Sequence, residues 1–211
     1  MRRFIFLVVF CIPTAFYAQD FKSVIENSTF GVRGGLSLAD YIANPSHKVV
    51  PRIMPFAGGY AEYEVKEGFI FRPELLLMFT GGIQHTFLPN TSNPEYLADE
   101  KLTYIYMPLL VKYNFMGIDL MAGPQFGFRL SANYVNTIVD NGEITYESSA
   151  DISEYRRFID FGLALGAVYP LTEQINAELR YSYGLSTINN VTTTVKLHTS
   201  IIQAGISFKI K

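Results

Sequence analysis

The chain has 211 residues, with 17 Lys and Arg against 19 Asp and Glu, which gives a formal net charge of −2. This balance offers no electrostatic basis for binding nucleic acid. Hydrophobic residues make up 49% of the chain and charged residues 17%, whereas a disordered chain combines low hydrophobicity with high charge. The single Cys excludes a disulfide framework and a zinc site built from several cysteines.

Residues 1–19 are predicted to be a cleaved signal peptide. A positively charged start precedes an apolar stretch at 4–18. A stretch of about 15 residues is too short to cross a membrane as a helix and fits the hydrophobic region of a signal peptide. Cleavage is expected near Ala18 or Gln19, which leaves 20–211 as a single outer-membrane domain. The alternative is that the segment remains as a short N-terminal anchor.

The domain contains a series of segments in which apolar and polar residues alternate. In the clearest one, 175–186, Leu179 and Tyr181 alternate with Glu178 and Arg180. This period of two predicts β-strands with one apolar and one polar face. Eight such strands are predicted, at 29–39, 52–66, 69–80, 103–115, 118–131, 159–169, 175–186 and 200–210.

The connections between these strands alternate in length. Short connections lie at 65–68, 115–118 and 170–174. Long polar segments lie at 40–51, 81–101, 132–156 and 187–197. Strands of this length and alternating loops are typical of outer-membrane barrels. The predicted fold is all-β, an eight-stranded antiparallel transmembrane up-and-down β-barrel.

The apolar faces of the predicted strands carry no charged residue, whereas the other faces do. A charge on a lipid-facing strand costs about 2–4 kcal/mol at the membrane midplane. The apolar faces are therefore expected to meet lipid and the polar faces to line the lumen. Candidates for the aromatic girdles at the membrane surfaces are Tyr113, Phe115, Phe126, Phe128, Phe161, Tyr169, Tyr181, Tyr183 and Phe208.

Five segments carry a resemblance to a known family: 72–77 (RPELLL), 104–115 (YIYMPLLVKYNF), 121–128 (MAGPQFGF), 160–166 (DFGLALG) and 178–185 (ELRYSYGL). They resemble the outer-membrane β-barrel family of Bacteroidetes, often labelled porin-like or PorT-like. The resemblance implies an eight-stranded barrel in a Gram-negative outer membrane, similar in architecture to the OmpA and OmpX barrels. PorT itself is implicated in a secretion system, which makes an accessory role in secretion an alternative here.

Charged residues on the polar faces form the candidate site. An eight-stranded barrel has an interior that side chains just fill, and buried charges must be paired. The balance of six cations and six anions favours an internal ion-pair network that fills the lumen. The alternative is a passive narrow pore for ions or small solutes. The predicted network consists of Arg33, Glu62, Glu64, Arg72, Glu74, Lys112, Asp119, Arg129, Asp160, Glu178, Arg180 and Lys209.

Other candidate groups fall in or beside the long polar segments. A lipid-modifying enzyme is a less favoured alternative, with His198 beside Ser200, or His85 with Glu95, as its reactive groups; His47 completes the histidines. No spacing among them is specific for catalysis, so no catalytic residue, cofactor or metal site is predicted.

The long segments also carry charges. The acidic ones are Asp140, Glu143, Glu147, Asp151 and Glu154. Their spacing is not that of an EF-hand, which favours ordinary solvated charges. The cations Lys101, Arg156 and Arg157 lie where they can meet lipopolysaccharide phosphates. The predicted function is a non-enzymatic barrel in the bilayer, whose long loops bind an envelope or extracellular protein.

Overall fold

The computed structural model describes residues 25–44, 50–87, 95–140, 143–189 and 196–210. The predicted signal peptide and the loop residue His47 lie outside these ranges. Within them, no helix has the length and apolar character needed to cross a membrane.

The described residues form nine β-strands and a short 3-10 helix, η1 (Ser153–Tyr155). The strands are β1 (Thr29–Asn44), β2 (Val50–Lys66), β3 (Phe69–Phe87), β4 (Glu95–Phe115), β5 (Ile118–Asp140), β6 (Glu143–Asp151), β7 (Ile159–Pro170), β8 (Ile175–Gly184) and β9 (Lys196–Lys209).

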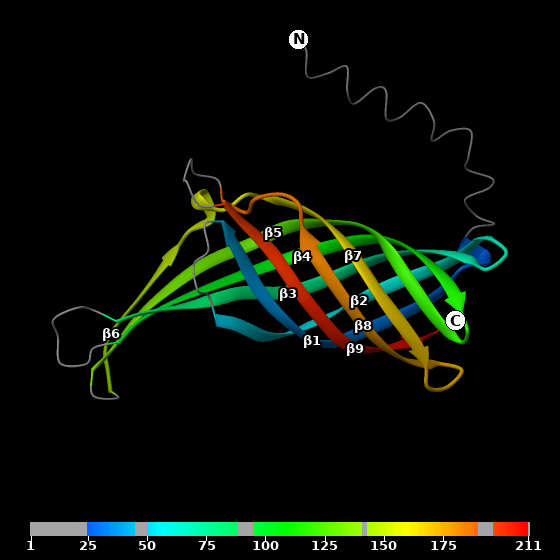
Figure 1. The fold of residues 1–211 in the computed structure, drawn as a ribbon, viewed down its shortest axis with the longest axis horizontal. Coiled ribbons are helices and arrows are strands. Elements are labelled where there is room, and N and C mark those ends of the chain that lie inside the picture. Colours follow the sequence, from blue (N-terminus) through cyan, green and yellow to red (C-terminus); the bar gives the residue numbers. More distant parts are fainter. Residues whose placement is uncertain (1–24, 45–49, 88–94, 141–142, 190–195, 211) are drawn as a thin grey trace, which may run out of the picture.

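Eight of the strands close into a ring. Each of β1 to β5 pairs with the next, β5 pairs with β7, and β7, β8 and β9 follow in order until β9 pairs with β1 (Figure 1). Every pairing is antiparallel. The predicted eight-stranded antiparallel barrel is confirmed. The additional strand, β6, pairs with the far end of β5 and lies outside the ring.

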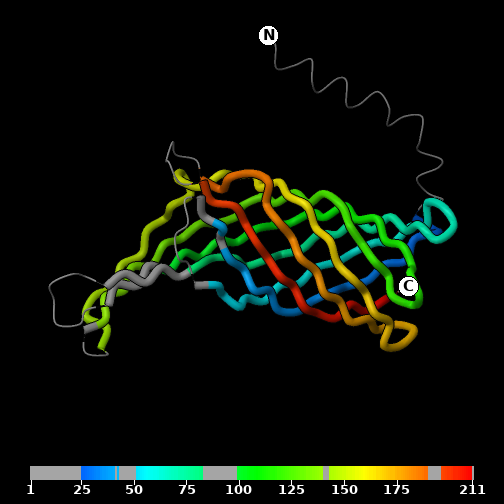
Figure 2. Tube along the Cα trace, viewed as in Figure 1, coloured from blue at the N-terminus to red at the C-terminus, as the bar shows by residue number. Residues whose placement is uncertain are grey.

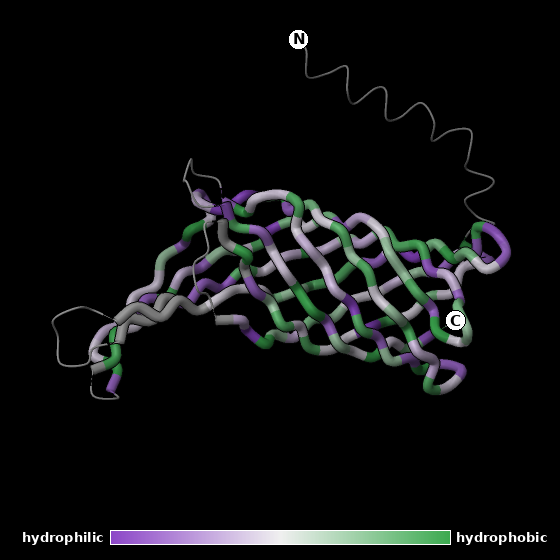
Figure 3. The backbone as a smooth tube through the Cα atoms, viewed as in Figure 1, coloured by the Kyte–Doolittle hydropathy of each residue, from purple (hydrophilic) through white to green (hydrophobic). Residues whose placement is uncertain are grey.

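Side chains alternate between the inside and the outside of the ring. Along β8, residues from Asn176 onward are buried at every second position, while Leu179 between them is exposed. Figure 3 shows the same alternation of hydrophilic and hydrophobic residues along the strands of the barrel body. The inward positions must be filled by their own side chains because the ring is narrow.

Tight turns join the strands at one end of the barrel, here called the short-turn end. Met116 and Gly117 connect β4 to β5, and both have positive φ angles, +54° and +86°. Positive φ at both central residues is the geometry that suits a short hairpin between twisted strands. The opposite end is called the long-loop end.

The long-loop end departs from the prediction. Segments 81–101 and 132–156 were expected to be loops, but β3, β4 and β5 continue through much of them, and β6 forms a hairpin with β5. In Figures 1 and 2 this four-stranded extension projects well beyond the rest of the ring. The apolar alternation is weak in this extension. The backbone pairing nevertheless continues, because polar residues on both faces of a sheet do not prevent hydrogen bonds between its strands.

Candidate functional site

A charged layer fills the part of the lumen nearer the short-turn end. Six different strands contribute its side chains, which therefore cross the interior from opposite walls. Four cations and four carboxylates are joined by direct ion pairs: Arg33, Arg72, Lys112, Arg180, Glu62, Glu74, Asp119 and Glu178.

Glu74 of β3 lies at the centre of this layer. Its carboxylate oxygens lie 3.0 Å from Arg33 Nη1, 2.8 Å from Arg72 Nε and 2.7 Å from Arg180 Nη1. Glu178 of β8 also contacts Arg33, at 3.2 Å, and Arg72, at 2.6 Å. Two carboxylates thus share three buried guanidinium groups, which is the compensation that buried charges require.

Lys112 extends the layer toward the short turns. Its Nζ lies 2.7 Å from Glu62 and 3.1 Å from Asp119. Glu62 also pairs with Arg72 at 3.3 Å, which joins this group to the central one. Four positive and four negative charges are therefore connected, so the layer is neutral as a whole.

Uncharged neighbours that the sequence did not single out also contact the arginines. The guanidinium of Arg72 lies 3.9 Å from the centre of the Tyr60 ring, and that of Arg33 lies 4.8 Å from the Phe56 ring. Gln203 accepts a hydrogen bond from Arg33 Nη2 at 3.4 Å. The sequence feature that could have identified these residues is their inward position in the strand alternation.

The remaining predicted members of the network lie elsewhere. Glu64 is exposed near the end of β2 and accepts a hydrogen bond from the Gly68 amide in the β2–β3 turn. Arg129 donates to the backbone oxygen of Arg157 at the long-loop end. Lys209 is partly exposed at the end of β9.

Asp160 is buried, yet its described partners are hydroxyl groups instead of the charged layer. Tyr106 and Thr199 donate to its Oδ2 at 2.9 and 3.0 Å, and Ser186 donates to Oδ1 at 2.7 Å. Three donors satisfy the carboxylate. Asp160 forms a separate polar site nearer the long-loop end.

An apolar layer occupies the lumen around and beyond Asp160. It includes Leu76, Met78 and Leu102, each at most 1% exposed. Ile188, from the β8–β9 connection, packs into the same cluster and so covers it from the long-loop end. The lumen therefore holds the charged layer nearer the short-turn end and combines this apolar cluster with the Asp160 site nearer the long-loop end, whereas the sequence predicted a polar lining throughout.

Ion pairs also lie at the rim of the long-loop end. Arg156 Nη2 donates to Glu100 at 2.7 Å, and Arg52 pairs with Asp99. Lys101 is half exposed and lies 3.5 Å from Asp99. Arg156 and Lys101, predicted as contacts for lipid phosphates, thus have protein partners.

His198, which was considered as a reactive group beside Ser200, contacts other residues instead. His198 stacks on Tyr183, with ring centres 6.0 Å apart, and its Nδ1 lies 3.0 Å from the Gly184 carbonyl oxygen. Ser200 donates to the Tyr181 hydroxyl instead. The side chain of His85 lies outside the part that can be described. Among the described residues, no group of His, Cys, Asp and Glu has the arrangement of a metal site.

Comparison with known proteins settles the family. A family model described as "Outer membrane protein beta-barrel domain" matches residues 17–190. The chain belongs to this family. It is therefore an outer-membrane β-barrel protein embedded in the lipid bilayer. No curated protein was found to match the chain.

Several solved structures are similar to this outer-membrane barrel at low sequence identity. Neisserial surface protein A is 15% identical, with a TM-score of 0.49, over 86% of this chain and 97% of that one. A major outer membrane protein from Thermus thermophilus is 11% identical, with a TM-score of 0.45, over 87% of this chain and 99% of that one. Ail, the attachment invasion locus protein of Yersinia pestis, is 14% identical, with a TM-score of 0.41, over 86% and 97%.

The outer face of the barrel has the aromatic residues that suit the two membrane surfaces. At the short-turn end, Phe69 and Tyr113 lie 4.9 Å apart between ring centres. Toward the long-loop end, Phe126 and Phe161 lie 5.2 Å apart. Aromatic rings favour the interface between hydrocarbon and water, as the predicted girdles require.

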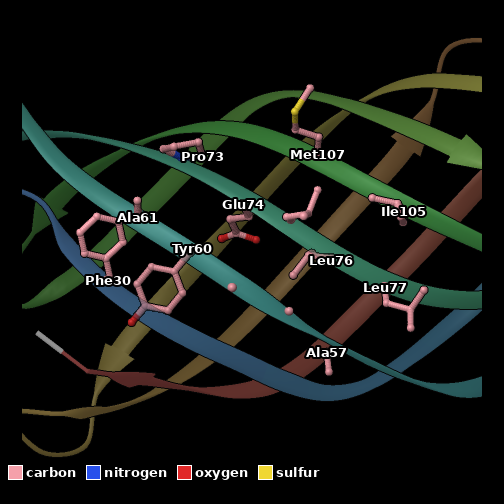
Figure 4. A pocket seen from close by; sticks show the side chains of 13 residues that line it. Phe30, Ala57, Tyr60, Ala61, Pro73, Glu74, Leu76, Leu77, Ile105 and Met107 are labelled. Atoms are coloured by element: carbon pink, nitrogen blue, oxygen red, sulfur yellow. The ribbon is translucent and has the colours of Figure 1, made fainter. Parts of the chain in front are cut away.

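A hollow of about 690 Å³ lies on this lipid-facing surface across β2, β3 and β4 (Figure 4). Small residues of β2, Ala57 and Ala61, form part of its floor, and Pro73 and Met107 contribute larger side chains. Pro73 also lies where the β2–β3 pairing is interrupted, since proline has no N–H to donate. The lining is almost wholly apolar, as contact with hydrocarbon requires.

Proposed function

We propose that this protein is a closed, non-enzymatic outer-membrane barrel whose projecting sheet binds a partner outside the cell. The observation that carries the proposal is that β3 to β6 continue as one paired sheet past the ring, while the lumen inside the ring is filled. In outer-membrane barrels the short turns face the periplasm and the long connections face outward. The projecting sheet is then the part that the surroundings can reach.

The filled lumen argues against a pore. Ions would have to cross both the neutral charged layer and the apolar layer that contains Leu76 and Met78. Hydrophobic constrictions exclude water, and an ion path needs water or substitute ligands. The predicted PorT-like kinship, the secretion role that goes with it and the cleaved signal peptide stay predictions.

The refolded protein is expected to be electrically silent in planar bilayers, because no continuous wet path leads through the two layers. Single-channel recording is the measurement, and the shift in gel mobility on heating is the control that the barrel has formed. Steady conductance steps from folded protein would contradict the closed lumen.

Shortening the hairpin is expected to abolish binding at the cell surface while leaving the barrel intact. In the shortened variant an Asn-Gly turn replaces 136–148, because Val135 and Ser149 are paired and an Asn-Gly turn suits such a hairpin. Cells that produce either form are compared for adhesion to collagen, laminin and fibronectin. The proposed function is wrong if both forms adhere equally to every surface.

A further inference from the structure

A polar hollow adjoins the apolar hollow of Figure 4 on the side of the short-turn end. It has a volume of about 470 Å³ and is lined by residues 63–67, at the end of β2 and the start of the β2–β3 turn, together with Asn27. The apolar hollow is lined by Ala57 to Ala61 of the same strand. Ala61 and Tyr63 are successive outward positions of β2, so one hollow begins where the other ends. The two are here called the β2 groove, which is apolar toward the membrane interior and polar at the short-turn end.

The β2 groove has the depth of one membrane leaflet. Lys66 lies nine positions after Ala57, which corresponds to about 30 Å along a strand. A strand tilt of about 40° reduces this length to about 23 Å along the membrane normal. One leaflet with its head groups is about 20–22 Å deep. Because short turns face the periplasm in outer-membrane barrels, the groove follows the periplasmic leaflet, where the lipids are phospholipids.

The polar end of the groove carries charges of both signs. Lys66, Glu64 and Glu67 line it, and all three are exposed. No ion pair joins Lys66 or Glu67 to another described residue. An ethanolamine phospholipid has a phosphate and an ammonium group in one head group, so it can pair with a cation and a carboxylate together. A phosphatidylglycerol head group has the phosphate alone, and the carboxylates would repel it.

We propose that the β2 groove binds one ethanolamine phospholipid of the periplasmic leaflet. An acyl chain lies over Ala57 and Ala61, where small side chains leave room beside Phe30 of β1. The phosphate pairs with Lys66 and the ammonium group with Glu67. The inference goes beyond the proposed function, which concerns the opposite end of the barrel.

The lipid that the purified barrel retains tests the proposal. The folded full-length protein is placed in nanodiscs with equal amounts of dioleoyl phosphatidylethanolamine and dioleoyl phosphatidylglycerol, transferred to nonionic detergent and measured by native mass spectrometry. We expect one lipid per chain, with phosphatidylethanolamine retained about threefold more often, as suits a difference of one exposed charge pair. Retention of both lipids in equal amounts overturns the proposal, because it shows general lipid contact. A mass of two chains without lipid also overturns it, because a second copy then covers the groove.

A pair of alanine variants tests the apolar part of the groove. Ala57→Phe fills the space over β2 and is expected to lower the retained phosphatidylethanolamine by about threefold or more, since the acyl chain loses apolar contact area. Ala204→Phe on β9 is the matched control, because Ala204 is also an exposed alanine of the outer face and lies outside the groove. Equal retention by the two variants overturns the position of the acyl chain.

A pair of charge variants tests the head-group contacts. Glu67→Lys is expected to reverse the preference toward phosphatidylglycerol, because the ammonium group loses its partner and the phosphate gains a second cation. Glu173→Lys places the same charge in another turn of the short-turn end and should leave the preference unchanged. An unchanged preference in Glu67→Lys overturns the head-group assignment. Gel mobility with and without heating confirms that each variant is folded, and no readout here depends on adhesion.

Discussion

Replacing Glu74 with Leu is expected to destabilise the folded barrel by about 3–5 kcal/mol. Glu74 contacts Arg33, Arg72 and Arg180, and its side chain is fully buried. Without this carboxylate, three guanidinium groups share only Glu178 as a central anion, and the layer has an excess positive charge. Unfolding in urea, followed by far-ultraviolet circular dichroism in detergent micelles, measures the change.

Glu64→Leu is the matched control for this substitution. Glu64 is exposed at the β2–β3 turn and lies outside the charged layer, so its loss should change stability by only about 0.5 kcal/mol. Removing Arg180 together with Glu74, as Glu74→Leu with Arg180→Met, should recover part of the lost stability because it removes the excess positive charge from the layer. Equal stability of Glu74→Leu and Glu64→Leu would show that the layer does not support the fold.

The barrel could be predicted because its outer face has a simple physical requirement. Every strand in the membrane must present apolar residues to lipid at alternate positions, and this produces a period of two that is visible in the sequence. The prediction failed at the projecting sheet. β6, EITYESSAD, is exposed to water on both faces, and only Ile144 and Tyr146 alternate with polar residues there, which is too short a pattern to predict a strand.

The lumen could be predicted only in part. Strand alternation predicts which charges point inward, and the structure buries Glu74 and Arg180 in the lumen. It does not say which charges meet, because contacts across the barrel depend on the stagger between strands. Asp160 is buried but contacts hydroxyl groups, and Glu64 is exposed because β2 ends two residues beyond it. The apolar layer was missed because the lumen-facing side of every strand was expected to be polar, although Leu76 and Met78 occupy inward positions of the alternation.

Gly58→Val is expected to prevent folding or to cost at least about 3 kcal/mol, whereas Gly59→Val next to it should be tolerated. A Cβ at Gly58 would lie 2.0 Å from the Leu75 carbonyl oxygen and 2.8 Å from the Leu76 Cα. Both atoms belong to the backbone of β3, which cannot move aside without breaking the pairing of β2 with β3. At Gly59 the nearest atom is the Gly31 oxygen, at 3.6 Å, which is an ordinary contact.

Comparing substitutions at Gly58 and Gly59 therefore shows whether glycine is needed at one position for steric reasons or is preferred throughout this strand. Val favours strands and is apolar, so at the lipid-facing Gly59 it should leave stability equal or higher. Because the clash at Gly58 arises at the Cβ itself, Gly58→Ala should be nearly as harmful as Gly58→Val. The folded fraction of each variant is measured by its gel mobility with and without heating. If both Gly58 variants fold as completely as Gly59→Val, β2 and β3 do not approach each other as closely as the structure places them.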